Sequence, residues 1–326
     1  MNSSGPFGNV IEKTTTGGER MAELKIRMRP SAKQEKPFEP EEIGGFLISA
    51  PLTTKNSGFS KWGFCQMDGE TFFIKQFLTP VYPDDAVDLQ PGIKNKKCKE
   101  CMMWYDKKAH IYRVICEAQN GNIIAPIRFF KHKCHFYIVT ERVPESNLSF
   151  SDIPDMSDRQ RHLLLLVIAS CFSSLASKQI VHADMKPDNI LLKKTVEGHY
   201  TAKIIDFDAS YLTSDPPFGD DVQGTPEYFA PESFLALAEE EVTLDPKVDV
   251  FALGIIFHEM LCGEKPKFDS AYSYAYETVL NDAPLQISEA IAPMYRYILE
   301  NMLKKKPEER WSAAHVFNVL KKMQSS

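Results

Sequence analysis

The residue types best suited to chemistry are concentrated in the stretch 182–189, which reads His-Ala-Asp-Met-Lys-Pro-Asp-Asn. It supplies a carboxylate (Asp184), an amine (Lys186) and a carboxamide (Asn189) at close spacing, and a further acid, Asp206, follows the apolar pair 204–205 downstream. Phosphoryl transfer needs an acid that orients a hydroxyl, a cation beside the moving phosphoryl group and oxygen ligands for magnesium. The spacing therefore predicts a phosphoryl-transfer site.

The elements that must hold these residues are predicted from hydrophobic periodicity and end signals. The apolar run 190–192 predicts a strand directly after the loop. Ser157 is suited to cap a long helix that runs to Ser177, and Asp245-Pro246 precedes a helix over 248–261 that Gly263 ends. Further helices are expected over 271–280, 291–303 and 312–323.

The first part of the chain has a different pattern. Residues 1–40 are rich in Gly, Ser, Thr and Lys and predict a flexible tail. Strands are then expected over 46–48, 59–67, 71–77, 122–130 and 134–143, with a hairpin turn at Asp68-Gly69 and a helix over 94–117. Five strands and one helix would form a small sheet-rich lobe, followed by a mainly helical one.

From about Phe46 to Met323, the order of these elements resembles the eukaryotic-type Ser/Thr protein-kinase family. Several motifs occur in order: the catalytic loop, Asp206-Phe207, the segment 224–232 (Gly-Thr-Pro-Glu-Tyr-Phe-Ala-Pro-Glu), the segment 249–254 (Asp-Val-Phe-Ala-Leu-Gly) and Arg310. The resemblance implies an α+β, bilobal fold with a five-stranded antiparallel N-lobe. The implied boundaries are a tail over 1–40 and a kinase domain over 41–326, with lobes over 41–142 and 143–326.

The resemblance also implies catalytic roles. Asp184 would accept or orient the proton of a Ser or Thr hydroxyl on a protein substrate, and Lys186 would neutralise the transferred phosphoryl group. Thr225 would bridge these two residues. Asn189 and Asp206 would be the ligands of Mg²⁺, which prefers hard oxygen donors.

For ATP, the resemblance implies that Lys75 holds the α- and β-phosphates and that Gly58 belongs to the phosphate-binding loop. The backbones of Glu141 and Val143 would bind adenine at the hinge between the lobes, beside Thr140. Glu100 is the predicted helix acid that pairs with Lys75.

The implied scaffold depends on three further residues. Glu232 and Arg310 would form a buried ion pair, and Asp249 would accept backbone amides of the catalytic loop.

The chain departs from the family pattern in its smaller lobe. Only Gly58 survives of the glycine-rich window 53–58, and glycine allows the closest backbone approach to phosphate. The acid expected to pair with Lys75 is ambiguous as well. Counting back from residue 122 along the family pattern leads to a position near Lys108, which is not an acid. Asp106 is a second acidic candidate beside Glu100.

Two more departures lie in the larger lobe. Ala183 replaces the arginine that normally binds an activation-loop phosphate, which predicts activity without phosphorylation of that loop. Asp208 replaces the glycine after Phe207 and adds a carboxylate near the metal ligands.

Composition limits the other possibilities. The net charge of −6 gives no reason to expect nucleic-acid binding, and no apolar run approaches the roughly 20 residues of a membrane span. Seven scattered cysteines in a long chain predict reduced thiols and a cytoplasmic protein. Cys98 and Cys101, with a Cys–His turn at 132–135, predict helix-borne thiols and a polar turn rather than a zinc site.

Three functions remain open at this stage. The first is an ATP- and Mg²⁺-dependent Ser/Thr protein kinase, of unknown oligomeric state. The second is a pseudokinase, which the degraded glycine loop and the uncertain helix acid favour. The third is a small-molecule kinase, against which the segment 224–232 argues.

Overall fold

The computed structural model describes residues 38–55, 60–83, 90–144 and 146–324. The expected tail over 1–40 lies almost wholly outside these ranges, as does Gly58. The fold described below is that of the unit Phe38–Ser326.

The first part of this unit is a six-stranded antiparallel sheet in the order β1-β2-β3-β4-β6-β5. Its strands are β1 (Glu41–Ile43), β2 (Phe46–Ile48), β3 (Ser60–Met67), β4 (Glu70–Phe77), β5 (Pro126–His132) and β6 (His135–Glu141). The sheet has one strand more than expected, because the turn Gly44–Gly45, with positive φ at both glycines, folds β1 back onto β2. The turn at Asp68-Gly69 joins β3 to β4 as predicted.

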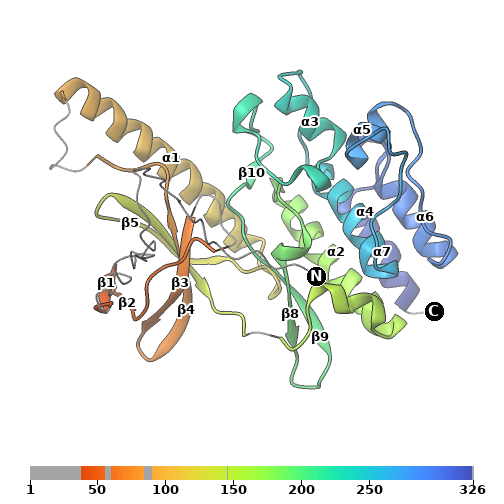
Figure 1. Cartoon of the computed structure of the whole chain (residues 1–326), viewed down its shortest axis with the longest axis horizontal. Coiled ribbons are helices and arrows are strands. Elements are labelled where there is room, and N and C mark those ends of the chain that lie inside the picture. The colour runs from red at the N-terminus through yellow and green to blue at the C-terminus, as the bar shows by residue number, and fades with distance from the viewer. Residues whose placement is uncertain (1–37, 56–59, 84–89, 145, 325–326) are drawn as a thin grey trace, which may run out of the picture. The chain divides into compact units, whose positions relative to one another are not determined.

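The second part is mainly helical (Figure 1). The α-helices within the described ranges are α1 (Pro91–Glu117), which belongs to the smaller lobe, and α2 (Asp158–Ser177), α3 (Pro231–Leu237), α4 (Lys247–Cys262), α5 (Ala275–Leu280), α6 (Pro293–Met302) and α7 (Ala313–Gln324). Two short two-stranded antiparallel sheets accompany them, formed by β7 (Ile180–Val181) with β10 (Tyr211–Leu212) and by β8 (Ile190–Lys194) with β9 (Tyr200–Ile204). Short 3-10 helices lie at Phe150–Asp155, Pro187–Asn189, Gly219–Asp221, Pro226–Tyr228 and Pro307–Glu309. The structure therefore confirms the α+β, bilobal fold class.

Helix ends follow the signals in the sequence. The Ser157 hydroxyl accepts a hydrogen bond from the Gln160 amide at 3.3 Å and caps α2. The Asp245 carboxylate accepts one from the Lys247 amide at 2.7 Å at the start of α4, and Gly263, with φ of 83°, ends that helix in the left-handed conformation.

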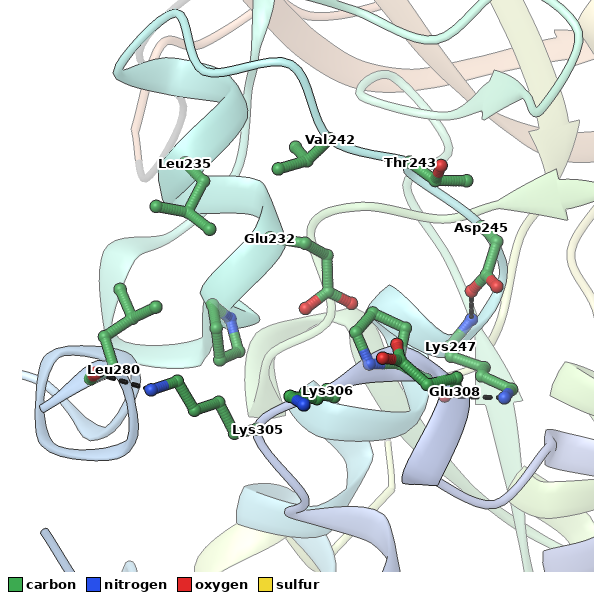
Figure 2. Close-up of a pocket in the computed structure, with 12 residues that line it drawn as sticks. Glu232, Leu235, Val242, Thr243, Asp245, Lys247, Leu280, Lys305, Lys306 and Glu308 are labelled. Carbon is green, nitrogen blue, oxygen red and sulfur yellow. Dashed lines mark hydrogen bonds between the residues drawn. The ribbon is translucent and has the colours of Figure 1, made fainter. Parts of the chain in front are cut away.

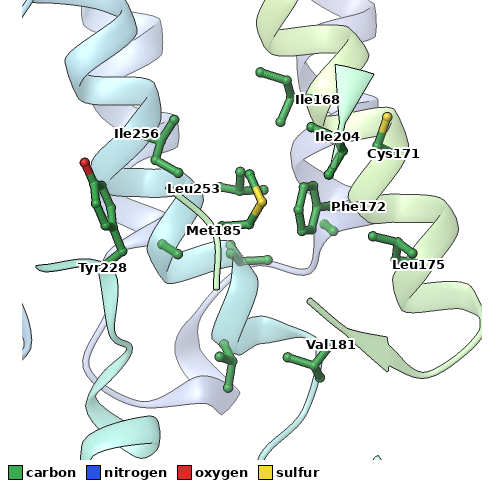
Figure 3. Close-up of a cluster of buried hydrophobic side chains, with 14 of the residues drawn as sticks. Ile168, Cys171, Phe172, Leu175, Val181, Met185, Ile204, Tyr228, Leu253 and Ile256 are labelled. Atoms are coloured by element: carbon green, nitrogen blue, oxygen red, sulfur yellow. The ribbon is translucent and has the colours of Figure 1, made fainter. Parts of the chain in front are cut away.

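The core of the larger lobe forms around α4, whose side chains are buried on nearly every side. A helix that is apolar all round is a helix enclosed by other elements. Leu253 and Ile256 of α4 lie near Met185 of the catalytic loop and near Phe172 of α2 in one continuous cluster (Figure 3). This packing anchors the predicted catalytic loop to the most buried of the helices that the structure describes.

Helix α2 is the one helix in the described ranges that is long and apolar enough to cross a membrane by length and composition. It packs against α7 and β9, and Leu164, Leu165, Ile168 and Phe172 are buried in the lobe core. Its apolar character is thus used in packing within this unit.

Candidate active site

The catalytic loop brings three polar side chains of the larger lobe into direct contact. The Lys186 ammonium lies 2.9 Å from one carboxylate oxygen of Asp184 and donates to the Thr225 hydroxyl at 3.1 Å. The Thr225 hydroxyl in turn donates to the other Asp184 oxygen at 2.7 Å. Asp184 is thus held by a cation and a hydroxyl, as its predicted role as an orienting base requires.

The hairpin formed by β8 and β9 places the two predicted metal ligands. Asn189 precedes β8 and Asp206 follows β9 closely, and the antiparallel register pairs Ile190 with Ile204. Both ligand candidates therefore lie at the same end of the hairpin. The Asn189 amide nitrogen donates to the Asp184 carbonyl at 2.6 Å, which turns the amide oxygen away from that carbonyl.

Backbone conformation at this site is strained in two places. Ala183 and Asp206 have φ of 69° and 64°, in the left-handed region that residues with a side chain seldom adopt. Such outliers persist where the surrounding structure imposes them, and they occur often at functional sites. These two unfavourable conformations thus lie beside Asp184 and at one of the two predicted metal ligands.

Asp249 supports the loop from beneath. Its two carboxylate oxygens accept hydrogen bonds from the amides of His182 and Ala183, at 2.8 and 3.0 Å. Burial raises the pKa of Asp249 to about 6, although the contacts to His182 and the two amides oppose this rise. The predicted scaffold contact of Asp249 is therefore present.

The buried ion pair predicted between Glu232 and Arg310 is present as well. Two guanidinium nitrogens of Arg310 donate to the two carboxylate oxygens of Glu232 at 2.6 and 3.1 Å, and both side chains are buried. This bidentate geometry is the strong form of an Arg–carboxylate contact. It ties α3, which follows the segment around Thr225, to the loop before α7.

A hollow of about 460 Å³ adjoins Glu232 (Figure 2). Its three lysines already have partners. Lys305 donates to the Leu280 carbonyl at 2.8 Å, Lys247 donates to the Pro307 carbonyl at 2.5 Å, and the Lys306 ammonium lies 3.9 Å from a Glu309 carboxylate oxygen. None of the predicted catalytic or nucleotide-binding residues lines it. The candidate active site therefore lies elsewhere.

A cavity of about 520 Å³ joins the two lobes at the predicted site. Its polar lining includes Lys186, Asn189, Asp206, Asp208 and Lys75. This volume lies within the range of about 300–1,000 Å³ that is usual for small-molecule sites. The hinge residues Thr140, Glu141 and Val143 also line the cavity, as predicted.

Aromatic side chains form a wall of this cavity that the sequence analysis did not identify. Trp62, Phe64 and Phe73 line it, and the rings of Trp62 and Phe73 stack at 5.9 Å. The signal was present, because 62 and 64 lie on one face of a strand with period two, and Phe64 pairs with Phe73 on the neighbouring strand. Flat apolar side chains are suited to bind a planar base.

Lys75 contacts acids different from the one predicted. Its ammonium lies 2.8 Å from an Asp206 oxygen and 2.9 Å from an Asp208 oxygen. Burial opposes the charge of Lys75, but the two carboxylates outweigh burial and raise its pKa. The same contact lowers the pKa of Asp206 against the effect of burial, whereas burial and the Asp206 charge raise that of Asp208.

The prediction that Glu100 pairs with Lys75 is wrong. The Glu100 side chain is 59% exposed and lies 3.9 Å from Lys96 on its own helix. Helix α1 is long, and at about 3.6 residues per turn Glu100 lies about two turns before Lys108, where α1 faces the site. The alternative acid, Asp106, is exposed.

The proposed metal fits the oxygen donors present. Asn189 and Asp206 offer hard oxygen atoms to the same cavity, and Mg²⁺ is commonly held by one or two protein oxygens together with substrate phosphates. No group of three or more His, Cys, Asp or Glu side chains suited to hold a metal by itself occurs in the described ranges. Cys98 and Cys101 lie on α1, and all seven cysteines are free.

Comparison with known proteins agrees with this geometry. The family model described as protein kinase domain matches residues 94–320. The match begins within α1, so β1 to β4 and Lys75 lie outside it. A serine/threonine-protein kinase of Drosophila simulans is 29% identical over 239 residues, which are 69% of this chain and 30% of that protein.

Other relatives give a similar result. A serine/threonine-protein kinase of Drosophila melanogaster is 28% identical over 239 residues, again 69% of this chain and 30% of the relative. A probable myosin light chain kinase of Dictyostelium discoideum is 26% identical over 206 residues, 61% of this chain and 65% of the relative. The chain spans about 30% of the length of its Drosophila relatives. Since the family model covers well over half of the sequence, the chain belongs to the protein kinase domain family.

Proposed function

We propose that this protein is an ATP- and Mg²⁺-dependent kinase that transfers the γ-phosphoryl group of ATP to Ser or Thr hydroxyls of protein substrates. The observation that carries the proposal is the contact of Asp184 with Lys186 and Thr225, at 2.9 and 2.7 Å, beside the cavity that Asn189 and Asp206 line. The names of the Drosophila relatives are consistent with this substrate class.

In the proposed mechanism, Asp184 orients the substrate hydroxyl and receives its proton as the oxygen attacks the γ-phosphorus. The bond from that phosphorus to the β–γ bridging oxygen breaks at the same time, and ADP leaves with the bridging oxygen. Lys186 neutralises negative charge on the phosphoryl group during transfer. The Thr225 hydroxyl holds the Asp184 carboxylate and the Lys186 ammonium in fixed positions relative to each other. Bound Mg²⁺, held by Asn189 and Asp206, would neutralise phosphate charge.

The nucleotide would occupy the cavity between the lobes. Trp62, Phe64 and Phe73 offer an apolar wall to the base, and the backbone at Glu141 and Val143 offers hydrogen-bonding groups to its edge. Lys75 is placed to contact phosphates from the side of the sheet. The predicted part of Gly58 in phosphate binding lies outside the described residues.

The pseudokinase is the second candidate, and one observation favours it. Lys75 forms two ion pairs with the Asp206–Asp208 segment, so a nucleotide must compete with Asp206 for this ammonium. Such a protein would bind nucleotide without turnover.

One experiment separates the candidates. Purified full-length protein is incubated with labelled ATP, Mg²⁺ and generic protein substrates, beside an Asp184→Asn variant. We expect label on Ser or Thr with the wild-type protein and a loss of about 10²–10⁴-fold in the variant, the usual contribution of a general base. Nucleotide binding without transfer by the wild-type protein would support the pseudokinase, and label on a small molecule alone would exclude a protein substrate.

A further inference from the structure

The carboxylates that face Lys75 come from the segment after β9 and not from helix α1, where the resemblance places one. Lys75 lies on β4, and its side chain is 11% exposed. Both of its ion pairs are made with one short segment of the larger lobe, through Asp206 at 2.8 Å and Asp208 at 2.9 Å. Helix α1, described over its full length, places no carboxylate on this ammonium.

Helix α1 presents a cation to the same place. The Lys108 ammonium donates a short hydrogen bond to the backbone carbonyl of Asp208. One turn further along the helix, the buried Tyr112 hydroxyl donates to an Asp208 carboxylate oxygen at 3.4 Å. Residues four apart share one face of a helix, so this face of α1 is directed at Asp208 through two side chains.

Asp208 is therefore shared by two elements. One carboxylate oxygen contacts Lys75 and the other faces Tyr112, while its carbonyl contacts Lys108. Two lysines and two aspartates lie together here, and their formal charges cancel. An acid at position 108 would approach Asp208, and a second acid at this point would leave the buried cluster with an excess of negative charge.

We propose that Asp208 is the positioning residue of Lys75, in place of a carboxylate on α1, and that Lys108 fastens α1 to the segment that carries Asp208. This inference rests on the proposed function in so far as Lys75 serves to bind ATP. Asp206 cannot hold Lys75 alone, because its oxygens also have to serve the metal. Asp208 supplies the second carboxylate, which lets Asp206 turn to the metal while Lys75 stays in place.

The role of the Asp208 carboxylate can be tested by removing it and by placing a carboxylate on α1 instead. Asp208→Gly removes the carboxylate, and Lys108→Glu returns one to α1. We expect Asp208→Gly and Asp208→Asn to raise the KM for MgATP about tenfold with a smaller change in kcat, since loss of a positioning contact weakens nucleotide binding first. The double variant Lys108→Glu/Asp208→Gly regains a carboxylate but loses the Lys108 contact, so it should bind MgATP about threefold more tightly than Asp208→Gly without reaching the wild-type affinity.

The matched control is Glu100→Gln, which alters an exposed acid on the same helix and should leave KM and kcat unchanged. The inference is overturned if Asp208→Asn binds MgATP as the wild-type protein does. It is also overturned if the double variant binds no better than Asp208→Gly.

A measurement without nucleotide keeps this result separate from the proposed function. A double-mutant cycle of Lys75→Met and Asp208→Asn is followed by denaturant unfolding. We expect the two residues to be coupled by at least about fivefold in the unfolding equilibrium constant, as contacting residues are. Additive effects would overturn the inference. Absence of phosphoryl transfer by the wild-type protein would refute the proposed function alone, because the cycle would still decide the role of Asp208.

Discussion

The hydroxyl of Thr225 contacts two charged side chains, so substitutions that keep or remove this hydroxyl can test its contribution. The Thr225 hydroxyl is both donor to Asp184 and acceptor from Lys186. We expect Thr225→Val to lower kcat by about 10–100-fold, since a hydrogen bond to a charged group contributes about 1.5–3 kcal/mol. Steady-state kinetics with a protein substrate would measure this loss. Thr225→Ser keeps the hydroxyl and should stay near the wild-type rate, and an equal loss in both variants would argue against the bridging role.

Hydroxyl residues of the activation segment allow a test of whether its phosphorylation is needed for activity. Ser210 and Tyr211 are buried, and the Ser210 hydroxyl donates to the His182 carbonyl at 3.2 Å, so replacing them would disturb the fold. Ser214 is exposed, and Thr213 is half-buried, with its hydroxyl donating to the Gln179 side chain at 3.1 Å. Because Ala183 offers no guanidinium to a phosphate, we expect the variant Thr213→Ala/Ser214→Ala to keep activity within about twofold.

The measurement is phosphorylation of a generic substrate by protein treated with phosphatase, beside untreated protein. A large loss of activity on dephosphorylation, or in the double alanine variant, would show that loop phosphorylation controls this enzyme.

Local secondary structure explains which residues of the candidate site could be predicted from the sequence. The catalytic loop was predictable because Asp184, Lys186 and Asn189 are close in sequence and belong to one turn. The hairpin of β8 and β9 adds Asp206 by local pairing alone. These positions depend on short-range structure, which spacing and apolar runs encode.

The partner of Lys75 was not predictable in the same way. It depends on how far α1 extends and which of its turns faces β4, and that is a matter of tertiary packing. Glu100 is the right residue type on the right helix, yet it lies more than one turn from the site. The aromatic wall of Trp62, Phe64 and Phe73 shares this origin, since cross-strand register decides which rings meet.

Helices α4 and α6 pack closely at Gly254. Gly254 of α4 has no room for a side chain, because an added Cβ would lie 2.8 Å from a Leu303 methyl and 3.2 Å from the Met302 Cβ. We expect Gly254→Ala to lower the free energy of unfolding by about 1–3 kcal/mol, the usual cost of overpacking. Denaturant unfolding followed by circular dichroism would measure it.

Gly92 provides the control, since it is also a helical glycine but has nothing within 4 Å of an added Cβ. Gly92→Ala should be neutral or stabilise by up to about 1 kcal/mol, as alanine favours helix. Equal destabilisation by both substitutions would refute the packing argument.

At the scale of the whole molecule, the cavity draws its lining from both lobes. Lys75 and the aromatic wall come from the sheet, whereas Asn189 and Asp206 come from the larger lobe. A ligand that contacts both sides therefore joins them, and binding to the folded state alone stabilises it. The stability of this protein should depend on nucleotide and metal together.

We expect MgATP at 100 times its Kd to add about 2.7 kcal/mol to the free energy of unfolding. At about 2–4 °C per kcal/mol, the thermal midpoint should rise by several degrees. Thermal unfolding with ATP, with MgATP and with ATP plus a chelator would measure the metal-dependent part. Asp206→Asn should lose that part, and a midpoint that rises equally in all three conditions would contradict the predicted metal site.

The enclosure of α4 has a consequence for how sequences of this fold can vary. On α7, the buried residues Ala313, Val316 and Leu320 follow the spacing of one helix face. Positions that tolerate random substitution should therefore recur along α7 with the period of a helix. On α4, neighbours surround nearly the whole circumference. A library of random variants selected for folding should thus show depletion along α4 with no period, and a survey of tolerated substitutions alone would fail to identify this segment as a helix.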